Sequence, residues 1–347
     1  MMRVEQKMTP TKAILVSQLT KQFGDFKAVD AISFDITQGE IFGFLGPNGA
    51  GKSTTIKMLT TILKPTSGHA LVFDLDVVKQ PLEVRKTFGI VFQEYSLDMD
   101  LTGWENLRFH ARMYGMKEDF FKERAKMLME LVELTDWENK IVKTYSGGMR
   151  RRLELIRSVI HGPKLLFLDE PTLGLDPQSR RHIWTYLRKL NKEEGITIFL
   201  TTHYMEEADQ LCDRVAIIDH GKIVANDTPQ SLKTILGGDV LTIDAGTAAP
   251  KLLQFIEEES GIGGQIKKVD VVQGKVRIMG DQGESLIPSI VNLATARGID
   301  IKNVSMNRPS LDDVFFHYTG NQMRVEGPEM MPGTRMQMMK KMRQGAM

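Results

Sequence analysis

The stretch Gly46-Pro47-Asn48-Gly49-Ala50-Gly51-Lys52-Ser53 limits the possible architectures of this chain more than any other. It matches the pattern G-x-x-x-x-G-K-[ST], in which a glycine-rich loop joins a strand to a helix. The compact apolar run EIFGFLG leads into it, and STTIKMLTTIL follows it with helical periodicity. The stretch therefore predicts a strand–loop–helix unit that binds a nucleoside triphosphate, with GTPases and kinases still open.

The residue types in this loop have physical reasons. Gly46, Gly49 and Gly51 allow the backbone to turn tightly and to approach phosphates closely. The N–H groups of the loop then form an anion cradle at a helix N-terminus. Lys52 brings a positive charge to the β- and γ-phosphates, and Ser53 can place its hydroxyl on Mg²⁺. The expected nucleotide-contacting set is completed by Pro47, Asn48, Ala50 and Thr54.

The segments around the loop predict an α/β architecture. Alternating apolar positions predict strands over residues 12–45, and periodic segments predict a mostly helical region over about 96–160. KLLFLDE and ITIFLTTH are short apolar runs, typical of buried parallel strands. Together they predict a P-loop core with an antiparallel β subdomain and an inserted helical subdomain.

An apolar strand that ends in Asp169 and Glu170 supplies the second half of a hydrolytic site. Asp169 is placed to bind the Mg²⁺ shell, as a P-loop enzyme requires. A carboxylate at Glu170 is suited to polarise the attacking water as a general base. A solvated strand end is the alternative, but a phosphate loop in the same chain favours the functional interpretation.

Composition excludes several classes of protein. The 347 residues suit two domains, and 45 Lys+Arg against 44 Asp+Glu give no basic field for nucleic acid. The single cysteine, Cys212, permits no internal disulfide, which fits a reducing compartment. We expect no secretory signal at the start of this sequence, and none of its apolar runs is long enough to span a bilayer. If this protein works at a membrane, we expect another chain to do the spanning.

A second unit is expected after the first. We place a nucleotide-binding domain at residues 10–235 and an α+β accessory domain at 236–320, whose βαββαβ order is that of a ferredoxin-like unit. The segment SLDDVFFHYTG predicts a final helix that packs back on one of the domains. Residues 321–347 hold eight of the 21 methionines and several basic residues. We expect this tail to be disordered; contact with a membrane surface or a partner is the alternative.

Between the two halves of the site lies Tyr145-Ser146-Gly147-Gly148-Met149, and here the chain resembles the ATP-binding cassette (ABC) family. Phe23 resembles the aromatic residue that stacks on adenine, and Gln93 the glutamine that senses Mg²⁺ and the membrane partner. Asp176 looks like the residue of the loop that crosses the dimer interface, and His203 like the switch histidine that reaches the γ-phosphate. Each residue also has a purely structural interpretation: a core aromatic for Phe23, a polar strand end for Gln93, a turn residue for Asp176 and a structural histidine for His203. The resemblance covers about residues 12–235, with its motifs in order.

The resemblance implies a mechanism and partners. Ser146, Gly147, Gly148 and Met149 would contact the ATP of the opposite subunit, because the loop around Lys52 already holds phosphate in its own chain. The family thus implies ATP and Mg²⁺ as ligands, a homodimer or a related ABC subunit, and a transmembrane permease. It also implies a peripheral location on the cytoplasmic face of the membrane.

The signature departs from the common Leu-Ser-Gly-Gly-Gln at Tyr145 and Met149, which puts the contacts of the missing amide in doubt. Tyr-Ser-Gly-Gly-Met followed by three arginines, and the ending SLDDVFFHYTG, are similar to the exporter branch that includes daunorubicin-resistance ATPases. They extend the likeness to about residue 320. A soluble ABC ATPase without a transport role and an ATP-sensing regulator remain alternatives. The sequence does not identify the cargo.

Overall fold

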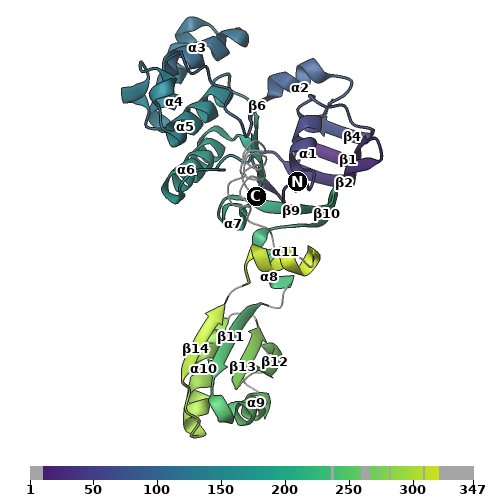
Figure 1. The fold of residues 1–347 in the computed structure, drawn as a ribbon, viewed down its shortest axis with the longest axis vertical. Coiled ribbons are helices and arrows are strands. Elements are labelled where there is room, and N and C mark those ends of the chain that lie inside the picture. Colours follow the sequence, from purple (N-terminus) through teal and green to yellow (C-terminus); the bar gives the residue numbers. More distant parts are fainter. Residues whose placement is uncertain are drawn as a thin grey trace, which may run out of the picture.

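The computed structural model describes residues 11–235, 238–258, 266–272, 274–280, 283–307 and 309–319. The expectation for the methionine-rich tail, residues 321–347, lies outside the described residues. Figure 1 shows a larger part and a smaller part with two short helices, α8 and α11, between them.

A six-stranded sheet forms the centre of the larger part. Its strands in spatial order are β10 (Lys222–Asp227), β9 (Arg214–Asp219), β3 (Ile41–Leu45), β8 (Thr197–Thr202), β7 (Leu165–Asp169) and β6 (Phe88–Val91). All neighbours are parallel except β10 and β9. Alternate side chains enter different cores: Phe42 and Phe44 lie in one, and Ile41 and Leu45 in the other. Burial on both faces explains why these strands are apolar throughout.

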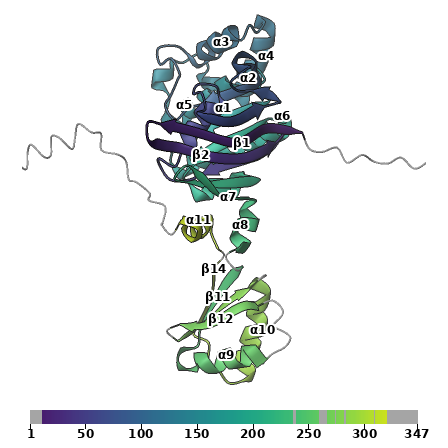
Figure 2. The ribbon, with the colours of Figure 1, turned by 90° about the vertical axis from the view of Figure 1, so that its right-hand side faces the viewer.

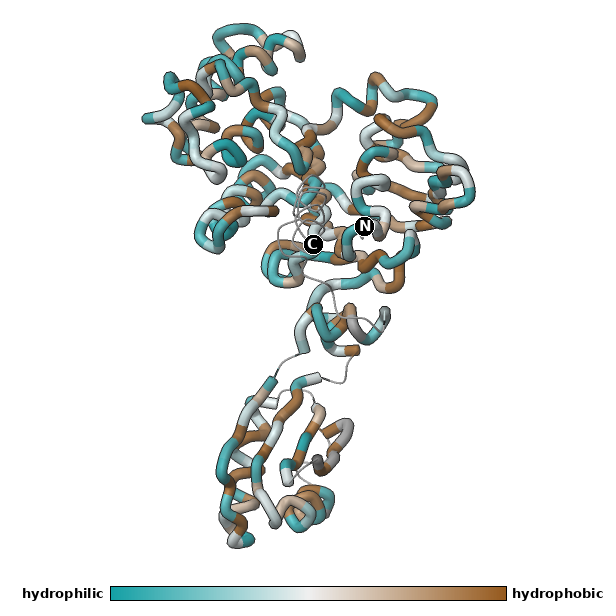
Figure 3. Tube along the Cα trace, in the orientation of Figure 1, coloured by the Kyte–Doolittle hydropathy of each residue, from teal (hydrophilic) through white to brown (hydrophobic). Residues whose placement is uncertain are grey.

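An antiparallel sheet covers one of these cores. Its order is β2 (Phe26–Thr37), β1 (Lys12–Phe23), β4 (Ser67–Val72) and β5 (Leu75–Asp76). Helices α1 (Lys52–Leu59) and α2 (Pro81–Thr87) contribute Ile56 and Val84 to the same core as Phe34. The sheet thus backs the helix that follows the phosphate loop. Figure 3 shows hydrophobic stretches along the strands of both parts.

Helices cover the second core. They are α3 (Gly103–Met113), α4 (Glu118–Leu131), α5 (Gly147–Val159), α6 (Pro177–Glu194) and α7 (Met205–Leu211). Helix α3 begins with a reciprocal capping box between Thr102 and Glu105, which satisfies two backbone donors at its start. Figures 1 and 2 place α3 and α4 at the end of the larger part farthest from α8. The helical region expected over 96–160 is thus present.

The smaller part has the predicted βαββαβ order. It comprises β11 (Asp239–Asp244), α9 (Ala249–Glu258), β12 (Ile266–Val272), β13 (Lys275–Gly280), α10 (Gly283–Ala296) and β14 (Asn303–Asn307). The strands pair antiparallel in the order β12-β13-β11-β14. This is the strand order of a ferredoxin-like sheet. The unit has its own core, in which Leu241, Ile278 and Ile290 are buried.

The final helix packs back on the larger part. Helix α11 (Leu311–Thr319) contacts α7 and α8 (Pro229–Ile235). Leu311, Val314 and Phe315 share the helix-covered core with Leu232 of α8. The chain therefore leaves the larger part after α8 and returns to it at α11. We keep the domain limits 10–235 and 236–320 as a proposal, with α11 anchoring the second domain on the first.

Candidate nucleotide site

The loop Gly46–Ser53 lies between β3 and α1, and the packing around it requires glycine at two positions. A Cβ atom on Gly46 would lie 2.3 Å from the carbonyl oxygen of Ile218. Gly51 has φ +107°, and a Cβ there would lie 2.5 Å from the carbonyl oxygen of Ala28. Gly51 is also the N-cap of α1 and offers no capping side chain. The first N–H groups of α1 are therefore available to an anion.

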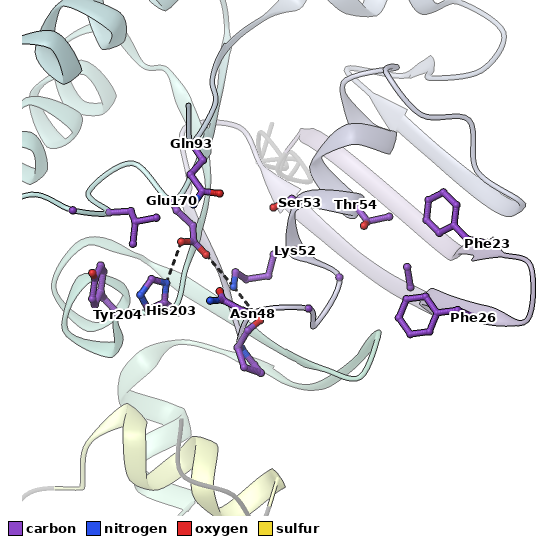
Figure 4. Close-up of a pocket in the computed structure, with 16 residues that line it drawn as sticks. Phe23, Phe26, Asn48, Lys52, Ser53, Thr54, Gln93, Glu170, His203 and Tyr204 are labelled. Carbon is purple, nitrogen blue, oxygen red and sulfur yellow. Dashed lines mark hydrogen bonds and ion pairs between the residues drawn. The ribbon is translucent and has the colours of Figure 1, made fainter. Parts of the chain in front are cut away.

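Three parallel strands bring the charged residues of the site together. Lys52 begins α1 after β3, Glu170 follows β7, and His203 follows β8. The carboxyl ends of neighbouring parallel strands lie at one edge of a sheet, so these residues meet there. Lys52 Nζ lies 3.1 Å from Glu170 Oε1, and His203 Nδ1 lies 3.1 Å from Glu170 Oε2 (Figure 4). Glu170 is thus held between two nitrogen groups.

Burial and charge act against each other at this pair. Burial alone would raise the pKa of Glu170, but the hydrogen bond with His203 and the charge of Lys52 outweigh it and hold that pKa below its ordinary value. Burial lowers the pKa of the Lys52 ammonium, and the Glu170 carboxylate opposes that shift. The Lys52 ammonium also donates to the carbonyl oxygens of Gly46 and Pro47, at 2.7 and 3.1 Å. An ionised Glu170 that is only 8% exposed but faces the cavity is suited to accept a proton from water.

Oxygen donors gather beside the loop. Ser53 Oγ lies 3.1 Å from Asp169 Oδ1, and Thr201 Oγ1 donates to that same carboxylate oxygen at 2.6 Å. Asp169 is only 5% exposed. A hydroxyl and a carboxylate are the hard oxygen ligands that Mg²⁺ takes in phosphate sites, where water and the substrate complete its shell. Among the described residues there is no cluster of three or more His, Cys, Asp or Glu that could hold a metal by itself. The residues present therefore fit Mg²⁺ that is shared with phosphates.

One cavity of about 850 Å³ lies at this site. The predicted residues on its wall are Phe23, Pro47, Asn48, Gly49, Gly51, Lys52, Ser53, Thr54, Gln93, Glu170 and His203. Three residues predicted to bind nucleotide or Mg²⁺ do not line the wall: Gly46 and Ala50 of the loop, and Asp169 at the end of β7. Ala50 and Asp169 are buried, at 3% and 5% exposure. The structure thus brings the first and the last of these predicted residues, Phe23 and His203, to the wall of the same cavity.

The cavity also contains residues that the sequence did not predict. Phe26 pairs with Phe23 across a hairpin turn, and Figure 4 shows both rings at the end of the cavity away from Tyr204. Tyr204 packs on His203 with ring centroids 4.2 Å apart, and the Arg180 guanidinium lies 4.0 Å from the centre of the Tyr204 ring. Two phenylalanines that flank Gly24-Asp25 are a readable hairpin signal. No pattern in the sequence singles out Tyr204.

The signature residues lie elsewhere. Neither Ser146–Met149 nor Asp176 lines the cavity in the described part of this chain. Ser146 caps α5 by accepting from the backbone N–H of Met149, at 3.3 Å. Asp176 caps α6 in the same way by accepting from the N–H of Ser179, at 2.9 Å. A Cβ on Gly148 would lie 2.9 Å from Ser179 Oγ, so the starts of α5 and α6 are in close contact.

Tyr145 has a structural role. It is 3% exposed, and its hydroxyl donates to the carbonyl oxygen of Trp137 at 2.6 Å. Burial raises its pKa to about 12, so the hydroxyl stays protonated and keeps this bond. Tyr145, which replaces the leucine of the common signature, therefore anchors the signature segment on the helical subdomain.

Comparisons with known proteins agree with this geometry. A family model described as "ABC transporter" matches residues 29–173, and one described as an AAA domain (putative AbiEii toxin, Type IV TA system) matches residues 141–209. The chain is 41% identical to a daunorubicin/doxorubicin resistance ATP-binding protein of Streptomyces peucetius, over 90% of this chain and 94% of that protein. This chain belongs to the ABC transporter family. It is 38% identical to a linearmycin resistance ATP-binding protein of Bacillus subtilis, over 88% of this chain and 98% of that protein.

A solved structure adds the chemistry of the ABC core. A dimeric ATP-binding cassette in a post-hydrolysis state with ADP and Pi superposes with a TM-score of 0.56 at 25% identity, over 62% of this chain and 98% of that one. This ABC subunit is an ATP-hydrolysing protein of the same fold. Within its described residues, no helix has the length and apolar character that crossing a membrane requires.

Proposed function

We propose that this ABC subunit hydrolyses ATP to drive a separate transmembrane permease that exports a toxic compound. The observation that carries the proposal is the position of the Glu170 carboxylate, held beside the phosphate loop by Lys52 and His203. Relatives over nearly the whole chain are named for resistance to daunorubicin, doxorubicin and linearmycin, which supports export of such compounds.

In the proposed reaction, ATP binds with its phosphates on the loop N–H groups and on Lys52. Ser53, Asp169 and Gln93 are the residues that would hold Mg²⁺, which neutralises charge on the phosphates. The phosphates offer Lys52 a second anionic partner, so Glu170 is released to accept a proton from the attacking water. His203 keeps the Glu170 carboxylate in place through its Nδ1 contact and stands ready for the γ-phosphate.

We further propose that two copies, or this chain and a related ABC subunit, close head to tail around two ATP molecules. Each copy would present the N-terminus of α5, with Ser146, Gly147, Gly148 and Met149, to the ATP held by the other. Asp176 would lie at the interface between them. The contact between Gly148 and Ser179 supports a shared movement of the two helix starts. ATP binds the closed state better than the open one, which is the source of the motion.

The decisive experiment for the transport proposal is a pull-down of the tagged chain from detergent-solubilised native membranes, with partners identified by mass spectrometry. A stoichiometric polytopic membrane protein is the expected result, and it would support a peripheral association of the subunit with the membrane. A soluble partner without any membrane protein would instead favour the alternative of a non-transport ABC ATPase.

The two phenylalanines of the hairpin provide a test of adenine binding. Phe23→Ala is expected to raise the KM for ATP about tenfold and to leave kcat unchanged, because base stacking contributes roughly 1–3 kcal/mol and the rings lie away from Glu170. The Phe23→Ala/Phe26→Ala double variant should lose more than Phe23→Ala alone. Phe120→Ala, which removes an exposed ring on α4, is the matched control. Steady-state kinetics provide the measurement, and an unchanged KM in the double variant would remove both rings from the site.

A further inference from the structure

A buried arginine connects three segments of the larger part. Arg151 lies in the first half of α5 and is 4% exposed. Its Nε donates to the carbonyl oxygen of Pro171 at 2.7 Å, and its Nη2 donates to that of Glu170 at 3.0 Å. Its Nη1 donates to the carbonyl oxygen of Phe92 at 2.6 Å and to Glu154 Oε2 at 3.0 Å. One planar guanidinium therefore holds α5, the end of β7 and the end of β6 together.

The backbone that Arg151 holds at Glu170 is strained. Glu170 has φ +50°, in the left-handed region that a residue with a Cβ atom rarely adopts. Such conformations persist only where the surroundings fix them from several sides. The Glu170 N–H donates to the carbonyl oxygen and the hydroxyl of Thr201, both at 3.1 Å, and the Glu170 carbonyl accepts from Arg151. These bonds determine where the Glu170 carboxylate points.

The same arginine holds the segment that contains Gln93. Glu154, the partner of Arg151, is completely buried. Its Oε1 accepts from the backbone N–H of Ser96 at 2.7 Å and from the Ser96 hydroxyl at 2.9 Å. Arg151 and Glu154 thus hold residues 92–96 at both ends. A shift of this segment would displace the guanidinium that fixes the Glu170 backbone.

We infer that Arg151, with Glu154 as its counter-ion, is a positioning residue that aligns the Glu170 carboxylate only when residues 92–96 are in place. The inference rests on the proposed role of Glu170. Arg151 does not itself line the cavity, and it reaches the wall through the backbone carbonyl of Glu170, so it acts on turnover through Glu170 and leaves ATP affinity alone. Conditions that move residues 92–96 would thereby switch hydrolysis on or off.

The test replaces Arg151 and Glu154 together, because breaking one half leaves a buried charge, while an apolar pair of similar volume often keeps the fold. Arg157, whose Nη2 lies 3.8 Å from Glu154 Oε1, loses this ion pair in the variant but keeps its hydrogen bond to the Ser96 hydroxyl. The full-length Arg151→Met/Glu154→Met variant is compared with wild type by its melting temperature, its Kd for a fluorescent ATP analogue, and kcat and KM for ATP. We expect an unchanged Kd and KM and a kcat lowered about 100-fold, since a small misplacement of a reacting group costs that much.

Arg152→Met is the matched control. Arg152 lies on the same helix and donates to the carbonyl oxygen of Val132, at 2.7 Å, so it anchors α5 without contacting Glu170 or residues 92–96. Its kcat is expected to stay at the wild-type value. Arg151→Lys keeps the charge but loses the planar fork, so it should also lose kcat at constant Kd, and it serves if the double variant does not fold.

The outcomes separate the inference from the proposed function. Wild-type kcat in Arg151→Met/Glu154→Met or in Arg151→Lys, while Glu170→Gln is inactive, would overturn the inference and leave the role of Glu170 intact. If both Arg151 variants bind ATP more weakly, turn over more slowly and melt at a lower temperature, Arg151 has only a structural role. Absence of hydrolysis by the wild-type chain would instead contradict the proposed function itself.

Discussion

Glu170→Gln is expected to lower kcat for ATP hydrolysis by about 10²–10⁴-fold, the usual contribution of a general base. The amide has the shape of the carboxylate but cannot accept a proton from water. It should leave the Kd for ATP close to that of wild type, because the loop N–H groups and Lys52 still face the phosphates. We also expect ATP-bound dimers to accumulate, since the step that reopens them is blocked.

Phosphate release and gel filtration with ATP provide the two measurements for this variant. Glu83→Gln on α2 is the matched control, because Glu83 is exposed and pairs only with Lys86 among the described residues. Near-normal turnover in Glu170→Gln would remove Glu170 from the role of base. The lowered pKa of Glu170 in the nucleotide-free subunit adds a pH expectation: the base stays ionised as pH falls from neutral, so acid loss of kcat/KM begins below the ordinary range of a glutamate.

Lys52→Met is expected to raise the Kd for ATP by about 10–100-fold, because a charged hydrogen bond to phosphate contributes roughly 1.5–3 kcal/mol. Its kcat should fall as well, since the same charge stabilises the transferred phosphoryl group. The methionine keeps most of the buried stem of the side chain, so the loss is electrostatic. Titration with a fluorescent ATP analogue measures the affinity.

Lys57→Met is the matched control for this substitution. Lys57 lies on the same helix, α1, in its last turn, and it is exposed. It should bind ATP as wild type does. If Lys52→Met kept wild-type affinity, the phosphates could not lie against Lys52, and the assignment of the loop as the phosphate site would be wrong.

The sequence predicted the local parts of this structure well. The phosphate loop, the apolar strand that ends in Asp169 and Glu170, and the βαββαβ order of the smaller part each depend on contiguous residues. The geometry of a short glycine-rich run or the period of a strand is set by neighbours in the chain. Elements β4, β5 and α2 were not predicted, because they are short and become stable only against the β1–β2 hairpin and α1.

Only the tertiary structure shows how distant residues of the site meet. The order β3-β8-β7 brings Lys52, Glu170 and His203 within hydrogen-bonding reach, although more than 100 residues separate the first two. Arg151 looked like one of three successive arginines, and only tertiary packing distinguishes it as the one that is buried on carbonyl oxygens.

The sequence by itself therefore predicted that this chain binds a nucleoside triphosphate, because the phosphate loop consists of adjacent residues whose backbone preferences are intrinsic. The alignment of Glu170, with its strained φ, depends on Thr201 of β8 and Arg151 of α5, and Arg151 is itself bonded to Phe92, which follows β6. Those partners meet only after the sheet has formed, since hydrogen bonds between distant segments are decided by packing of the two cores and leave no periodic trace in the sequence.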